Sequence, residues 1–182
     1  MNFENRRNKI FKGIYLDGAF LFHSLLNSEV RINYKKLVNY FLKENDFLAV
    51  CNYYTALPNE YDMDDKHRNF IKILKKEVRL RVRSVPLLKM HDIDGVAGSG
   101  TRYSKGEDIL LACDLVKGAY TNQWDACIIV TGDADQLPAV SAAMDAGKHV
   151  TIASFRNSLS HVLELEANAV VYLDDILSEV RL

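Results

Sequence analysis

The sequence has no surplus of charge of either sign. Its 23 lysine and arginine residues nearly balance its 24 aspartate and glutamate residues, so the formal net charge is −1 at pH 7. A chain with this balance has no overall electrostatic attraction for nucleic acid or for a membrane surface. Any such attraction must therefore come from a local cluster of charged residues.

Cysteine is also scarce, and the three residues Cys51, Cys113 and Cys127 are far apart in the chain. An odd number of cysteines at these spacings fits neither a zinc site nor a disulfide framework. Because all three have apolar neighbours in the sequence, we expect buried, reduced thiols in a cytoplasmic protein.

Long apolar runs are absent. The N-terminal residues MNFENRRNKIF lack the apolar core of a signal peptide, and no stretch is long enough to span a membrane. The 182 residues are 48% hydrophobic and 26% charged, which is typical of one globular domain. We expect a tail over residues 1–12 and a single domain over residues 13–182, without membrane contact.

The clearest pattern that is present is a strand, an acidic turn, a helix and a second strand. Residues 127–130 are apolar and largely β-branched, residues 136–146 have helical periodicity, and residues 149–153 are again apolar. Together they predict a βαβ unit. Asp133 and Asp135 lie in its turn, at the carboxyl end of the strand, where ligands bind in parallel sheets.

Strands and helices alternate along the rest of the chain. We expect further strands at 13–16, 47–54, 78–85 and 169–173, and helices at 19–26, 33–44, 62–76, 107–119 and 162–167. This alternation predicts an α/β fold with a mainly parallel sheet and helices on both faces. On the helix at 107–119 we expect Ile109, Ala112, Cys113 and Val116 to face inward.

Two further aspartates occupy positions similar to that of Asp133. Asp17 follows the strand at 13–16, where a plain helix N-cap is the alternative interpretation. Asp108 lies in the first turn of a helix, where an acid also complements the helix dipole. Asp114 lies about 240° further around that helix, so we favour Asp108 over Asp114 as a site residue.

These acids could meet at one edge of the sheet. Clustered carboxylates repel one another, and a hard divalent cation with oxygen ligands, Mg²⁺ or Mn²⁺, removes the conflict. A cation held by acids with bound water is suited to phosphoryl chemistry.

Basic residues are concentrated in one stretch. Arg79, Arg81 and Arg83 alternate along the strand at 78–85, directly after a lysine-rich segment. Such charges protect an edge strand from aggregation, or they contact phosphates. Both interpretations stay open.

Two other features are less specific. Tyr53 and Tyr54 end a predicted strand and are either core residues or platforms for base stacking. The segment 89–105 contains Gly95, Gly98 and Gly100 but matches neither a P-loop nor a dinucleotide fingerprint, and we expect a flexible substrate flap.

Three segments resemble the NYN domain family, the LabA-like branch of the PIN-like nucleases, and the resemblance extends over about residues 13–176. They are YLDGAFLF from residue 15, KGEDILLACD from residue 105 and VTGDADQLPAVSAAMDAGKHV from residue 130. The resemblance implies a three-layer αβα PIN-like fold and a metal-dependent endonuclease that hydrolyses RNA with Mg²⁺ or Mn²⁺.

The resemblance also implies which residues act. The family acids fall on Asp17, Asp108, Asp133 and Asp135, as catalytic and metal-binding residues, and Asp114 matches a frequent family acid of less certain role. For RNA binding we expect Lys105, Arg79, Arg81 and Arg83.

The sequence departs from the family pattern at three positions. Phe20 replaces an Asn near the metal, Gln136 replaces a Phe, and Asn168 replaces a late Asp. One alternative is therefore a catalytically weak RNA-binding or regulatory module. A metal-dependent phosphatase is less favoured, because Ala19 stands where an aspartyl-phosphatase needs a second Asp. A homo-oligomer is an open alternative to a monomer.

Overall fold

The computed structural model describes residues 9–26, 30–58, 60–78, 80–89, 102–103 and 106–182. The strands are β1 (Ile10–Asp17), β2 (Asp46–Leu57), β3 (Arg81–Pro86), β4 (Leu88–Lys89), β5 (Arg102–Tyr103), β6 (Ala126–Val130), β7 (His149–Ser154) and β8 (Ala169–Tyr172). The helices are α1 (Gly18–Leu25), α2 (Tyr34–Tyr40), α3 (Asp65–Glu77), α4 (Glu107–Tyr120), α5 (Leu137–Asp145), α6 (His161–Glu166) and α7 (Leu173–Val180), with short 3₁₀ turns η2 (Glu60–Asp62) and η3 (Ala134–Gln136).

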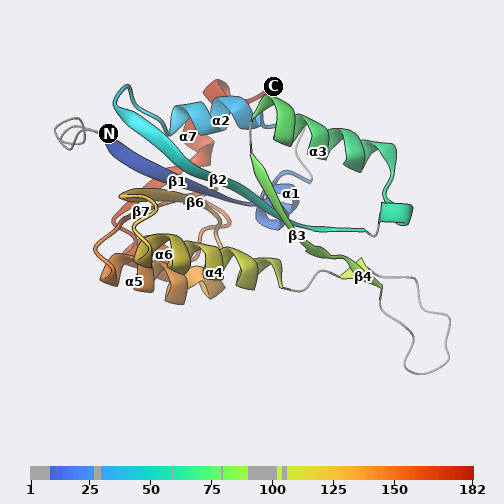
Figure 1. The fold of residues 1–182 in the computed structure, drawn as a ribbon. Coiled ribbons are helices and arrows are strands. Elements are labelled where there is room, and N and C mark those ends of the chain that lie inside the picture. Colours follow the sequence, from blue (N-terminus) through green and yellow to red (C-terminus); the bar gives the residue numbers. More distant parts are fainter. Residues whose placement is uncertain (1–8, 27–29, 59, 79, 90–101, 104–105) are drawn as a thin grey trace, which may run out of the picture.

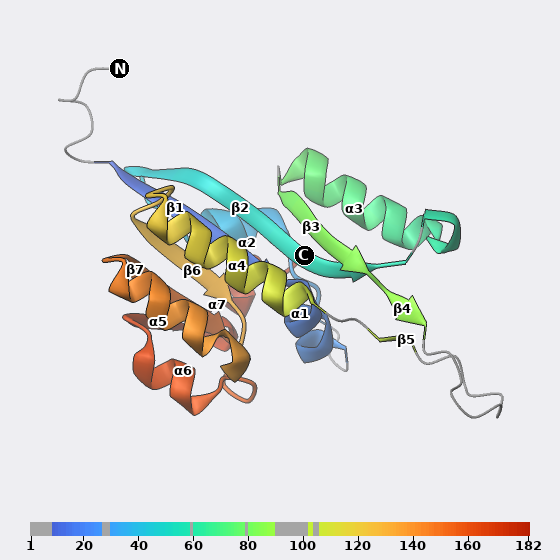
Figure 2. The ribbon, with the colours of Figure 1, turned by 60° about the horizontal axis from the view of Figure 1, so that its bottom comes forward.

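The main sheet has six strands in the order β3-β2-β1-β6-β7-β8, and every neighbouring pair is parallel. A separate antiparallel pair joins β4 to β5. One face of the sheet carries α1, α2, α3 and α7, and the other carries α4, α5 and α6 (Figures 1 and 2). The predicted α/β fold with three layers is therefore confirmed.

The side chains of the central strands alternate between two cores. Ile14 and Leu16 of β1 pack into the core under α1, α2, α3 and α7, and Tyr15 packs into the core under α4, α5 and α6. In the second core the buried Trp124 Nε1–H donates a hydrogen bond of 2.8 Å to the Tyr15 hydroxyl. Strands buried on both faces explain the nearly continuous apolar runs in the sequence.

The strand order reverses direction at the centre of the sheet. From β1 the chain proceeds outward through β2 and β3, and then it returns to place β6 on the other side of β1. Open α/β sheets bind ligands in the crevice at such a switch point, beyond the carboxyl ends of the strands. Here the two strands that flank the switch point end at Asp17 and Val130.

Several local predictions were wrong. β1 begins at Ile10, inside the expected tail, and the C-terminal helix α7 was not predicted. Cys51 and Cys127 are buried as expected, but Cys113 is exposed. Of the two interpretations of Tyr53 and Tyr54, the structure confirms the core one, because both side chains are buried.

The inward face of α4 was also assigned wrongly. Ile109 is 67% exposed and Cys113 is exposed, whereas Glu107, Leu111, Leu115, Gly118 and Ala119 are buried. The predicted Ala112 and Val116 are half-buried and do pack against the core, so the prediction is wrong for Ile109 and Cys113 only. The buried face of α4 is centred on Leu111 and Leu115, and it includes Glu107 rather than Ile109.

The basic segment is described only in part. β3 lies at the edge of the sheet, as predicted, but it starts at Arg81, because residues up to Glu77 continue α3. Arg79, Lys105, Gly95, Gly98 and Gly100 lie outside the described residues. In the described part of the chain, no helix combines the length and apolar character that crossing a bilayer requires.

Candidate active site

Asp17 lies at the end of β1 and is only 4% exposed. Its Oδ1 accepts a hydrogen bond of 2.9 Å from the Phe20 backbone N–H, as the N-cap of α1. Its Oδ2 accepts a hydrogen bond of 2.9 Å from the Thr131 hydroxyl, which follows β6. Asp17 is therefore the N-cap of α1 through Oδ1 only. Its Oδ2 connects β1 to the end of β6, at the switch point of the sheet.

Asp133 and Asp135 lie in the exposed turn after β6. The Asp133 backbone N–H donates to the Thr131 hydroxyl at 3.3 Å, and Asp133 Oδ1 accepts from the Asp135 backbone N–H at 3.0 Å. Thr131 therefore bridges Asp17 and the start of the acidic turn. Its buried hydroxyl fixes the relative positions of the two strand ends.

Gly132 has a separate role in this turn. A Cβ atom at Gly132 would lie 2.0 Å from the Ser158 carbonyl oxygen and 2.9 Å from the Phe20 ring. Only glycine permits this approach of the backbone to the loop after β7. The Ser160 backbone N–H donates to the Gly132 carbonyl at 2.9 Å, which holds that loop against the acidic turn.

The start of α4 brings two more acids to the same edge of the sheet. Asp108 is half-buried, and Glu107 is 4% exposed with its Oε2 atom buried and without a hydrogen-bond partner. Gln136 is 1% exposed; its Nε2 donates to the Asp108 carbonyl at 3.2 Å, and its Oε1 has no donor. Two buried oxygens without donors are uncommon and indicate a missing positive or hydrogen-bonding partner.

Sequence reasoning missed Glu107, Gln136 and Thr131 as site residues. A signal for Glu107 was present, because Glu107, Leu111, Leu115 and Ala119 recur at a spacing of four residues. That series defines a helix face as well as the predicted stripe did. Gln136 and Thr131 carry no such signal, since a turn residue shows its contacts only once the strands have assembled.

The acids lie within electrostatic range of one another. Burial, together with the smaller effect of the charges of Asp17, Glu107, Asp133 and Asp135, raises the pKa of Asp108 to about 6. Burial also raises the pKa of Asp17 against the opposing effect of its hydrogen bonds from Phe20 and Thr131, and the charges of Asp133 and Glu107 act in the same direction as burial. The structure therefore brings the four predicted aspartates to one edge and adds Glu107 to them.

Asp114 belongs to a different interaction. Its carboxylate accepts two hydrogen bonds from the Arg83 guanidinium, at 2.8 and 3.1 Å, and one of 3.0 Å from the Tyr54 hydroxyl. This bidentate ion pair ties α4 to β3 and β2. Arg83 is therefore not free to contact a phosphate, whereas Arg81 is exposed.

The donor set suits a hard cation, but the side chains do not surround one position. Among the residues that the structure describes, no three His, Cys, Asp or Glu side chains are placed to hold one metal ion. Mg²⁺ commonly keeps several water ligands and binds through one or two carboxylates. Asp17, Glu107, Asp108 and Asp133 supply carboxylate oxygens, and the donor-free oxygen of Glu107 fits a cation or its bound water.

Phe20 occupies the position of the family Asn without taking its polar role. Its backbone N–H donates to the Asp17 carboxylate, which caps α1, while its half-buried ring packs against Phe155 with ring centroids 6.3 Å apart. The phenyl ring thus contributes packing to the loop after β7 and no hydrogen bond to the acids.

Comparison with known proteins agrees with the fold and with the resemblance seen in the sequence. The family model described as the NYN domain matches residues 13–174. No curated protein shows a significant sequence match. Among solved structures, the crystal structure of a protein of unknown function from Vibrio parahaemolyticus is similar, with a TM-score of 0.75 and 21% sequence identity over 97% of this chain and 98% of that chain. At this identity the similarity shows a shared fold.

Proposed function

The chain belongs to the NYN domain family, whose members are typically nucleases, and from this premise we propose that it is a metal-dependent endoribonuclease. One observation carries the proposal: the buried Glu107 oxygen without a donor lies in a cluster of acids in which the pKa values of Asp17 and Asp108 are raised by burial and by the charges of their neighbours. Such a cluster is unfavourable in the folded protein unless a cation is bound. Its place at the switch point of the sheet is where a ligand is expected.

The residues of the cluster have different tasks in this proposal. Asp17 is immobilised by Phe20 and Thr131, so it offers a fixed carboxylate. Glu107 offers a buried one, and the exposed Asp133 and Asp135 lie where substrate and water can enter. Mg²⁺ or Mn²⁺, when bound, polarises a phosphate and lowers the pKa of a water ligand. The protein's contribution is to orient that centre and to place the phosphodiester next to it.

The test is cleavage of labelled single-stranded and structured RNA in Mn²⁺, in Mg²⁺ and in EDTA. We expect wild type to cut with metal only and Asp133→Asn to lose cleavage. Asp145→Asn is the matched control, because Asp145 is exposed on α5 outside the cluster. Cleavage that persists in EDTA or in Asp133→Asn would contradict the proposal.

A second candidate, an RNA-binding module without efficient catalysis, is favoured by a specific pair of observations. The described acids do not surround one metal position, and the family Asn is replaced by Phe20. In that case folded wild type would bind RNA in the presence of Mn²⁺ and leave several RNA substrates intact. A filter-binding assay beside the cleavage assay separates the two functions.

A further inference from the structure

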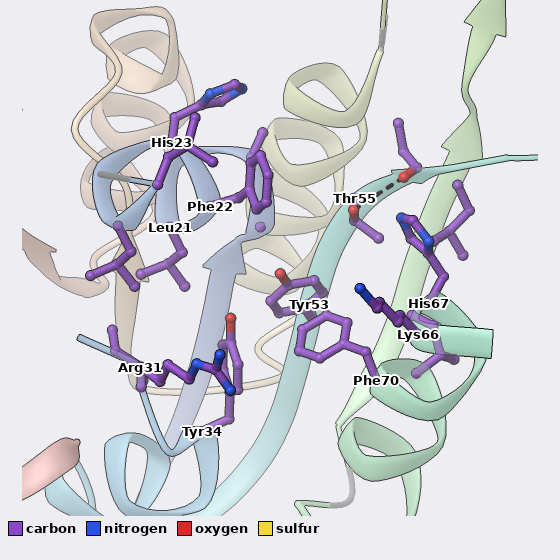
Figure 3. A pocket seen from close by; sticks show the side chains of 18 of the residues that line it. Leu21, Phe22, His23, Arg31, Tyr34, Tyr53, Thr55, Lys66, His67 and Phe70 are labelled. Carbon is purple, nitrogen blue, oxygen red and sulfur yellow. Dashed lines mark hydrogen bonds between the residues drawn. The ribbon is translucent and has the colours of Figure 1, made fainter. Parts of the chain in front are cut away.

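A large cavity opens beside the acidic cluster, between α1, β2 and α3. Its volume is about 810 Å³, within the range of roughly 300–1,000 Å³ that ligand pockets have. Gly18 and Glu107 line it, so one part of the cavity adjoins the acids. Figure 3 shows α1 and α3 as opposite walls and β2 between them.

Aromatic rings line the cavity. Tyr34, Tyr53 and Phe70 pack edge to face, with ring centroids 5.5–5.7 Å apart. On the α1 wall, Phe22 is 61% exposed (Figure 3). An exposed phenyl ring in the wall of a cavity offers a free face for stacking, and every nucleobase has a π-face that can use it.

Cationic side chains line the same cavity. Arg31 and Lys66 are exposed, and neither has an acidic partner in the described part of the chain. Lys66 extends from α3 toward the aromatic rings (Figure 3). These charges are opposite in sign to the neighbouring acidic cluster, so the two sites are suited to different parts of a ligand.

We propose that this cavity binds a nucleotide of single-stranded RNA adjacent to the bond that is cut, with the base against Phe22 and the backbone phosphates near Lys66 and Arg31. The inference rests on the proposed function, because that function places the cut bond at the acidic cluster. It requires an unpaired base, because a paired base is stacked inside a duplex and cannot enter a cavity. The protein would therefore select single-stranded segments, and an apolar peptide would leave Arg31 and Lys66 without partners.

Binding measured without cleavage tests the proposal. The probe is a fluorescein-labelled single-stranded RNA of about ten nucleotides, in EDTA, with fluorescence anisotropy as the readout. Phe22→Ala should weaken binding roughly 5- to 150-fold, the range of one lost base stack. Lys66→Ala should weaken binding and reduce the slope of log K against log salt by about 0.7.

Matched controls are available at the other end of α4. Tyr120 is 61% exposed, as Phe22 is, and Lys117 is exposed, and neither lines the cavity. Tyr120→Ala and Lys117→Ala should bind RNA as wild type does. Because all four side chains are exposed, thermal melting should show that each variant is folded.

The outcomes separate this proposal from the proposed function. Loss of binding in Phe22→Ala and Lys66→Ala supports the cavity whether or not wild type cuts RNA. Unchanged binding in both variants, or equal binding of a duplex of the same sequence, overturns the cavity proposal even if wild type is an active nuclease. A wild type that binds no RNA, or binds a free mononucleotide but not the oligonucleotide, also overturns it.

Discussion

Glu107 carries a carboxylate that the fold removes from water without giving its Oε2 atom a partner. We expect Glu107→Gln to raise the melting temperature of the metal-free protein, because a buried unpaired charge is replaced by a neutral group of the same shape. The same change should lower metal-dependent cleavage by at least about 10- to 100-fold, the usual effect of changing a residue that holds a metal ligand in place.

Glu179→Gln is the control for that variant, since Glu179 is exposed on α7. Its melting temperature and cleavage rate should match those of wild type. A Glu107→Gln protein that melts lower than wild type in EDTA would show that Glu107 makes a favourable contact rather than a repulsive one.

Asp108 makes the metal-free protein sensitive to pH. Its pKa is raised from 3.8 to about 6 in the folded state, so the folded state favours the protonated acid. The resulting stabilisation is complete below pH 3.8 and is lost as the pH rises through about 6. Asp108→Asn stays neutral, so its melting temperature relative to wild type should increase across that window in EDTA. A difference that does not change with pH would contradict this assignment.

Phe20 tests whether the missing family Asn matters. Phe20→Asn should change cleavage modestly, because the site already has its acids, and it should lower stability because the ring packs on Phe155. The loss should be smaller than the roughly 3–5 kcal/mol that truncating a fully buried Phe costs. Phe20→Leu, which keeps an apolar side chain, is the control in melts and cleavage assays. A large gain of cleavage in Phe20→Asn alone would show that the ring silences wild type.

At the scale of the elements, α4 shows how far the sequence alone could lead. Its existence and bounds were predicted closely, as were the strands around it, because periodicity and turn residues are local signals. Its orientation was predicted wrongly because the helix has two apolar stripes, one through Ile109 and Cys113 and one through Leu111 and Leu115. Periodicity cannot choose between two apolar stripes, and the packing of α4 on Tyr15 and Tyr54 decides which one is buried.

The acidic site was predictable to the same extent. Asp17, Asp108 and Asp133 follow from strand ends and a helix start, whose positions are local. Glu107 depended on the orientation of α4, so the error in that orientation caused its omission. The partners of Gln136 and Thr131 come from distant segments, and one sequence does not show such contacts.

Two arginines of the edge strand β3, for which the sequence predicts the same role, differ in the structure: Arg83 pairs with Asp114, and Arg81 is exposed. Arg83→Gln should lower stability by about 1–3 kcal/mol, because it leaves the partly buried Asp114 without its charged donor. Arg81→Gln should leave stability unchanged, since Arg81 is exposed. If Arg81 contacts phosphate, its loss should also reduce the salt slope of RNA binding.

Thermal melts and binding titrations of both variants measure these effects. Arg83→Gln that melts like wild type would mean that the ion pair to Asp114 contributes little to stability. An unaltered salt slope in Arg81→Gln would leave protection of the sheet edge as the role of that residue.

At the scale of the whole molecule, metal binding should stabilise the fold. The unfolded chain cannot bring the acids together, so only the folded state binds the metal. At a metal concentration of 100 times the Kd, the free energy of unfolding should increase by about 2.7 kcal/mol. Millimolar Mn²⁺ should therefore raise the melting temperature of wild type but not of Asp133→Asn. An unchanged midpoint in wild type would argue against the metal site, and Asp145→Asn should retain the shift.

The central position of β1 also determines when the acidic cluster can assemble during synthesis. Asp17 and Thr131, joined by a hydrogen bond, are 114 positions apart in the chain. A ribosome therefore completes β1, β2 and β3 well before it makes β6 and the acidic turn. Domains generally fold as units, and pairing between distant strands forms slowly. A nascent chain has only part of the acidic cluster until β6 docks beside β1, so under the proposed function we expect it to be inert toward the messenger RNA from which it is being translated.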